Sequence, residues 1–85
     1  MPIYHFHSAN GQREPDLEGM ELADDCAAQM AAVQYAGDVL RSDGPSVWSH
    51  GHWRVEVTNG DGELLFTVIT LGVDAPKPKR LAAQA

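Results

Sequence analysis

The feature that most restricts the fold of this chain is a pair of strand patterns joined by a tight-turn sequence. Residues 53–58 alternate apolar and polar side chains, and residues 64–71 form the most apolar stretch. Between them, residues 59–62 read Asn-Gly-Asp-Gly, and such residues tolerate the positive φ angles of a hairpin turn. The side chains expected to face the core are Trp53, Val55 and Val57. The pattern predicts an antiparallel hairpin with one buried face.

A second hairpin is predicted at the N-terminus. Residues 3–7 alternate and are rich in aromatic side chains, which favours a strand with Tyr4 and Phe6 on its buried face. The Asn-Gly pair at residues 10–11 indicates a turn, and residues 19–22 are expected to return as a short strand.

One helix is predicted between the two hairpins. Asp24 and Asp25 suit its start, because a carboxylate accepts hydrogen bonds from free amides and complements the positive end of the helix dipole. The Asp-Gly-Pro sequence at residues 43–45 is expected to end it, followed by a loop over residues 45–52. The prediction is an α+β fold of order ββαββ, with a four-stranded antiparallel sheet and one helix packed on one face.

The predicted helix carries two apolar stripes, whereas a surface helix normally shows one. The first comprises Cys26, Met30, Val33, Gly37 and Leu40, and the second comprises Ala28, Ala32, Tyr35 and Val39. We expect the second to be covered by a loop, the tail or another subunit, and we assign Tyr35 and Val39 to a partner surface. Alternatively, its alanines are present only as good helix formers. Trp48 is a further partner-binding candidate, since exposed tryptophan is enriched at interaction sites, unless it folds back onto the core.

The 85 residues allow one domain, assigned to residues 1–74, and residues 75–85 read as a mobile tail rich in proline and small side chains. A single cysteine excludes an internal disulfide. Neither a signal-peptide pattern nor an apolar run long enough to span a bilayer is present, which favours a cytoplasmic protein without a membrane partner.

The charge of −6 is unevenly distributed. Residues 1–74 hold all twelve acidic residues against three arginines, a balance of −9. Such a body repels phosphate backbones, so we expect no direct nucleic-acid binding, but it attracts a basic partner. The acidic partner-binding candidates are Glu14, Asp16, Glu18 and Glu21. The simpler interpretation is that the charge maintains solubility, and that Glu18 and Gly19 set a turn.

The four histidines are candidate metal ligands. His5 and His7 project from one strand face, and His50 and His52 flank the start of another strand. If those strands are neighbours, the four imidazoles meet around zinc, nickel or copper. The alternative is that they are surface residues. No other cofactor is indicated, because the chain lacks a glycine-rich phosphate loop, and its serines lack nucleophile-elbow glycines.

The order of these motifs over residues 1–71 resembles a family of short bacterial proteins of unknown function, common in soil alphaproteobacteria. The matching residues are Tyr4, Phe6, His7, Gly11, Asp16, Glu18, Gly19, Glu21, Leu22, Ala27, Ala28, Ala32, Ala36, Leu40, Trp53, Val55, Val57, Asp61 and Gly62. His5 departs from the family pattern, and residues 50–52 lie outside it. The resemblance implies a shared fold and a bacterial origin, and it implies no activity.

The sequence therefore favours a small non-enzymatic protein-interaction module that self-associates, most simply as a homodimer. One alternative is an acidic inhibitor that mimics nucleic acid and blocks a basic nucleic-acid-binding protein. In that case Asp24 and Asp25 join the four acidic candidates above. The other alternative is a histidine-based metal-binding protein.

Overall fold

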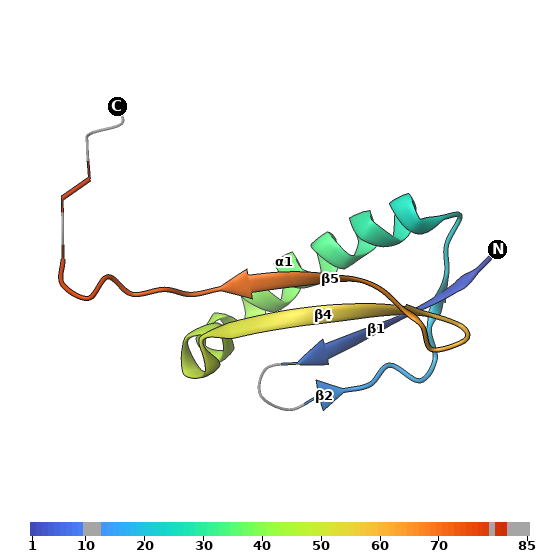
Figure 1. The fold of residues 1–85 in the computed structure, drawn as a ribbon, viewed down its shortest axis with the longest axis horizontal. Helices are drawn as coiled ribbons and strands as arrows, with labels where there is room; N and C mark the ends of the chain where they lie inside the picture. Colours follow the sequence, from blue (N-terminus) through green and yellow to red (C-terminus); the bar gives the residue numbers. More distant parts are fainter. Residues whose placement is uncertain (10–12, 79, 82–85) are drawn as a thin grey trace.

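An antiparallel sheet carries one long helix on one of its faces in the computed structural model, which describes residues 1–9, 13–78 and 80–81 (Figure 1). The elements are β1 (Ile3–Ala9), β2 (Arg13–Glu14), β3 (Met20–Glu21), α1 (Asp25–His50), β4 (His52–Asn59) and β5 (Leu64–Leu71). The strand order is β2-β1-β4-β5, and β3 also pairs with β1. The α+β prediction with an antiparallel sheet and one main helix is confirmed, although the sheet has five strands rather than four.

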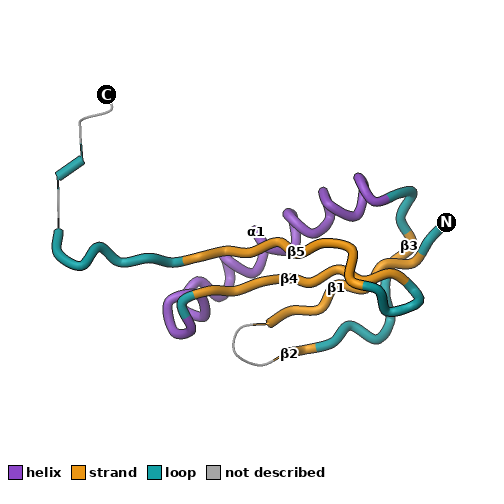
Figure 2. Tube along the Cα trace, viewed as in Figure 1, coloured by secondary structure: helices purple, strands orange, loops and turns teal. Residues whose placement is uncertain are grey.

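The extra strand arises because the segment returning along β1 pairs with it twice. Glu14 of β2 lies opposite Ser8, and Met20 of β3 lies opposite Tyr4. Figure 2 shows the two short strands, β2 and β3, near opposite ends of β1. Pro15 directly follows β2 and has no N–H to donate, which favours a break in the ladder at this point. The predicted strand over residues 19–22 is thus shortened to Met20–Glu21, and the turn predicted at residues 10–11 lies outside the described residues.

Helix α1 begins as predicted and ends later. Asp24 is its N-cap, and its Oδ1 accepts a hydrogen bond of 2.9 Å from the N–H of Ala27. The helix is interrupted at Asp43 (φ −142°, ψ 47°) but resumes to His50 and ends at Gly51 (φ 79°). The loop predicted over residues 45–52 was wrong, because Pro45 sits in the first turn of the resumed segment. A missing N–H costs nothing there, so proline starts a helical turn instead of stopping one.

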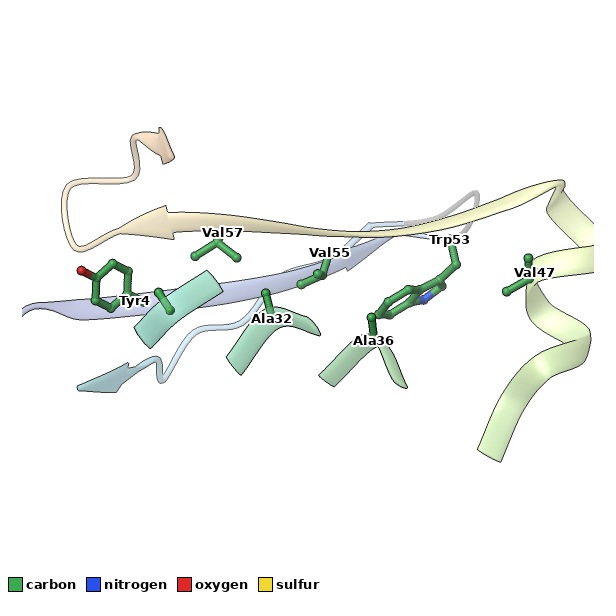
Figure 3. Close-up of a cluster of buried hydrophobic side chains, with 8 residues drawn as sticks. Tyr4, Ala32, Ala36, Val47, Trp53, Val55 and Val57 are labelled. Atoms are coloured by element: carbon green, nitrogen blue, oxygen red, sulfur yellow. The ribbon is translucent and has the colours of Figure 1, made fainter. Parts of the chain in front are cut away.

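Small helical side chains and larger strand side chains build the core (Figure 3). Ala28 and Ala32 are fully buried and let α1 approach the sheet, where Val55 and Val57 are also fully buried. The residues that complete this buried cluster are Tyr4, Ala36, Val47 and Trp53. The helix lies mainly over β4, contacts β5 less and contacts β1 least of the three strands.

The structure reverses our assignment of the helix stripes. Ala28 and Ala32 face the sheet, Val39 is half-buried beside them, and Tyr35 packs edge-on against Trp53 with ring centroids 5.7 Å apart. The other stripe is mostly open: Met30 is 63% and Val33 is 59% exposed, and only Leu40 packs against the core. Alanines therefore mark the sheet-facing side here, because a close helix–sheet approach requires small side chains.

The chain continues beyond β5 without a helix or strand over residues 72–78 and 80–81. The other residues of the predicted tail lie outside the described residues. Within the described part of the chain, α1 is not apolar enough to cross a membrane.

Candidate functional site

A groove of about 850 Å³ lies between α1 and the segment that returns along β1. Its apolar side chains come from both walls and are Phe6, Pro15, Met20, Leu22, Ala27, Met30, Ala31 and Tyr35. Its acidic side chains are Glu14, Asp16, Glu18 and Asp38. Four residues predicted to bind a partner therefore meet in one place, namely Tyr35, Glu14, Asp16 and Glu18. Glu21, Val39 and Trp48 do not line this groove.

The wall beside β1 is held by the Asp16 carboxylate. Its Oδ2 accepts a hydrogen bond of 3.0 Å from the N–H of Phe6, and its Oδ1 accepts bonds of 3.2 Å from the N–H groups of Glu18 and Gly19. Burial raises the pKa of Asp16, but the hydrogen bonds from Phe6, Gly19 and Glu18 outweigh that effect and leave the pKa below its usual value. Asp16 is therefore an ionised structural residue that takes the place of a strand partner for Phe6.

The backbone of Asp16 is fixed by two stacked histidines, whose ring centroids lie 6.1 Å apart. The N–H of Asp16 donates to Nδ1 of His7 (2.9 Å), so that nitrogen carries no proton. Nε2 of His7 therefore carries the proton and donates to Oγ1 of Thr58 at 2.9 Å. Nδ1 of His5 donates to the carbonyl oxygen of Asp16 at 3.0 Å.

His7 is consequently held neutral. Burial lowers its pKa, and the nearby charge of Arg13 lowers it further. Both ring nitrogens of His7 are occupied by internal hydrogen bonds, so a metal ion would have to displace one of them.

The predicted four-histidine metal centre is not assembled in the described part of the chain. Strands β1 and β4 are neighbours, as that hypothesis required, but His7 lies opposite Glu56, four residues along β4 from His52. At ~3.3 Å per residue this separates the two positions by about 13 Å. His52 instead has its Nε2 3.3 Å from a guanidinium nitrogen of Arg54, and His50 ends α1. Among the described residues, no group of three or more His, Cys, Asp or Glu side chains is placed to hold a metal ion.

Gly19 closes the end of the wall beside β1. It has φ +79°, and a Cβ atom added there would lie 2.7 Å from Cγ2 of Ile3 and 2.9 Å from Cε1 of His5. Both the backbone conformation and the lack of space therefore require glycine at this turn. The prediction that Glu18 and Gly19 set a turn agrees with this geometry.

Three of the six acidic residues expected to meet a basic partner are used inside the fold. Asp16 holds the turn, Asp24 caps α1, and Oδ1 of Asp25 accepts a hydrogen bond of 2.8 Å from the Tyr4 hydroxyl. That bond to Asp25 raises the pKa of Tyr4 to about 12. Glu14, Glu18 and Glu21 are exposed.

Trp48 lies away from the groove, at the last turns of α1, and is 60% exposed. A Cβ atom added to Gly72 would lie 2.9 Å from Cε3 of its indole ring, so the ring rests on the backbone that follows β5. It also lines a shallow depression with Gly44, Pro45 and Ser49. Trp48 packs on the chain after β5 and is not among the residues of the buried core cluster. Its role in partner binding stays a prediction.

Phe6, Met20 and Met30 are groove residues that the sequence did not indicate as partner-binding. Phe6 alternates with Tyr4 and was assigned to the core, and the two methionines stand in segments whose burial depends on tertiary packing. An apolar residue in a two-residue strand such as Met20 gives no periodic signal from which its exposure follows.

The fold and the groove define a small α+β protein in which a helix and the edge of an antiparallel sheet enclose an apolar cleft with an acidic rim. Residues 3–72 match the family described as "Domain of unknown function (DUF6894)", and the chain belongs to that family. This confirms the expectation of a family without an assigned function. No curated protein matches the chain, and no solved structure does.

Proposed function

We propose that this chain is a small protein-interaction module whose groove receives a basic, apolar segment of a partner protein. The proposal rests on the combination, in one groove of about 850 Å³, of apolar walls with carboxylate side chains. Grooves that bind peptides are mainly apolar and use a few charged groups to fix orientation.

The apolar walls of the groove are suited to an apolar side chain of a partner. Met20 is 52% exposed and Met30 is 63% exposed, on opposite walls of the groove. Covering such side chains removes apolar surface from water, and the unbranched methionine side chain adapts its shape to what binds.

The rim is suited to a cationic side chain. Glu14 and Glu18 are exposed, and no described cation forms a salt bridge with either. Residues 1–74 carry a net charge of −9, so these carboxylates add to a field that draws basic segments toward the groove. Asp16 lies between them and remains ionised, which keeps the rim negative at neutral pH.

We infer that the module acts by binding rather than by catalysis. Ser8 lines the groove, but the described lining contains no histidine or cysteine that would activate its hydroxyl group. A basic segment of a nucleic-acid-binding protein is one partner of the stated chemistry, so the acidic-inhibitor alternative uses the same rim, through Glu14 and Glu18. A bacterial origin and a cytoplasmic location remain predictions from the sequence.

The test is selection of binding sequences from a random peptide display library. Wild-type protein is expected to enrich peptides that combine arginine or lysine with leucine, isoleucine or phenylalanine. The double variant Glu14→Gln/Glu18→Gln is expected to lose that enrichment. The control Asp61→Asn/Asp74→Asn makes the same change in net charge at exposed sites outside the groove and should retain it. Absence of enrichment with wild-type protein, or equal loss in both double variants, would contradict the proposal.

A further inference from the structure

In the described part of the chain, β5 is an edge strand that pairs with β4 alone. The N–H of Gly72 donates to the carbonyl of Gly51 at 3.2 Å, so this pair at the end of the β4–β5 ladder is hydrogen-bonded. Antiparallel pairs alternate between bonded and non-bonded types. Leu71, which lies opposite His52, therefore belongs to a non-bonded pair, and the same holds for every second residue before it. The N–H and C=O groups of Leu71, Ile69 and Thr67 thus point away from β4.

The opposite edge of the sheet is protected. By the same alternation, Phe6 of β1 directs its N–H outward, and the Asp16 carboxylate accepts it. Strands β2 and β3 pair with β1 on either side of that point. In the described part of the chain, β5 has no strand or carboxylate in the corresponding position.

The residues of β5 also lack the usual safeguards of an exposed edge. Residues 64–73 contain no charged side chain and no proline. Edge strands that remain single are normally short or interrupted by lysine, proline or a bulge, because a long uncharged edge templates pairing with another chain. The one bulge of the β4–β5 ladder lies near its hairpin end, and the ladder is regular from Phe66 to Leu71.

We propose that β5 pairs antiparallel with β5 of a second copy, about a two-fold axis at Ile69. This register sets Ile69 opposite Ile69 of the second copy, and Thr67 opposite Leu71. It pairs all three outward-facing residues of each copy, so the two sheets join into one continuous sheet. A two-fold axis brings identical surfaces together, which suits a strand that carries no charge in a chain of net charge −6.

Apolar surface flanks this seam on both faces of the sheet. On the face away from α1, Ile69 is 58% exposed and Leu71 is 68% exposed. On the face toward α1, Phe66 and Val68 are only half-buried, because the helix lies mainly over β4. Pairing of two copies covers both surfaces and removes apolar area from water.

The open flank of α1 also lies on the β5 side. The groove beside β1 is lined by Ala31 and Tyr35, so that flank of the helix faces β1. At 100° per residue, Val33 and Gly37 fall on the other flank, and neither meets the sheet: Val33 is 59% exposed, and open space surrounds Gly37. In the proposed dimer these flanks of the two helices approach each other across the seam.

The test is the solution mass, measured by light scattering over a concentration series. Wild-type protein is expected to show a dimer, and Ile69→Lys is expected to raise the dimer dissociation constant at least tenfold, because it places two lysines opposite each other. Leu17→Lys is the control, since Leu17 is 86% exposed between β2 and β3 and gains the same charge. Circular dichroism establishes that each variant is folded. A wild-type monomer at every concentration, or equal dimerisation of Ile69→Lys and wild type, would overturn the proposal.

A cysteine pair tests the register in a Cys26→Ser background. Ile69→Cys is expected to cross-link two copies on oxidation, because hydrogen-bonded antiparallel pairs have Cα atoms ~5.5 Å apart, within the disulfide range. Thr67→Cys alone should not cross-link, since the two copies of that position lie about 13 Å apart along the strands. Cross-linking of Thr67→Cys in preference to Ile69→Cys would refute the register. None of these positions lines the groove, so the outcome is independent of the proposed partner-binding site.

Discussion

Replacing Asp16 by asparagine tests whether one carboxylate holds the wall of the groove. The carboxylate accepts three backbone hydrogen bonds, one from Phe6 at 3.0 Å and two, from Glu18 and Gly19, at 3.2 Å. Asparagine keeps one oxygen and replaces the other with an NH₂ group, which cannot accept. Either the Phe6 N–H or the N–H groups of the turn must therefore lose their acceptor.

The expected cost follows from the bonds that are lost. A hydrogen bond to a charged group contributes about 1.5–3 kcal/mol, so Asp16→Asn is expected to lower the free energy of unfolding by that amount. The sign of the pH dependence is also set. Because the folded-state pKa lies below the ordinary value of 3.8, the stabilisation by Asp16 is present above pH 3.8 and is lost as the pH falls through the folded-state pKa. The difference in free energy of unfolding between wild type and Asp16→Asn should therefore shrink in acid.

The assay is urea denaturation at neutral and acidic pH. Glu18→Gln is the matched control, since it removes one negative charge from the same turn at an exposed side chain that forms no hydrogen bond in the described structure. We expect it to change the free energy of unfolding by less than ~0.5 kcal/mol. If the two substitutions had equal effects, or if the difference in free energy of unfolding between wild type and Asp16→Asn did not shrink in acid, the Asp16 carboxylate would not hold this wall.

Three further predictions concern the surroundings of the groove and the end of the helix. Because the folded-state pKa of His7 is lowered from 6.5, acidification through pH 6.5 should lower the free energy of unfolding of the wild type. His7→Asn should weaken this pH dependence, as measured by urea denaturation. Gly19→Ala should cost about 1–3 kcal/mol in unfolding free energy because its φ is +79°, whereas Gly37→Ala in the open helix should gain about 0.5–1 kcal/mol. Gly72→Ala should displace the ring of Trp48 and shift its fluorescence, and an unchanged spectrum would contradict the packing described here.

The sequence predicted the elements whose signals are local. The alternation of residues 53–58, the Asn-Gly-Asp-Gly turn and the aspartate at position 24 each determine a neighbouring piece of backbone, and the hairpin and the helix start are found there. The prediction of where the helix ends was wrong, because an Asp-Gly-Pro sequence is compatible with two structures. It can end a helix, or it can interrupt one and begin a new first turn. Packing of Val47 into the core favours the second outcome.

The groove was predictable only in part because its two walls are far apart in the sequence. Tyr35 and Glu14 were assigned to a partner surface for separate reasons, and only the tertiary fold sets them around one cleft. The sequence also does not show that the Asp16 carboxylate is hydrogen-bonded inside the fold. That depends on three backbone N–H groups, one of them on β1, which only the tertiary structure brings together. The open edge of β5 follows from the strand order, which hydrophobic patterns do not specify.

Backbone amide chemical shifts would show whether the groove binds basic, apolar segments. Isotope-labelled protein would be titrated with a peptide of alternating arginine and leucine, and with a matched peptide in which glutamate replaces arginine. We expect saturable shifts at Phe6, Met20 and Met30 with the basic peptide alone. Shifts confined to residues outside the groove, or equal shifts with both peptides, would contradict it.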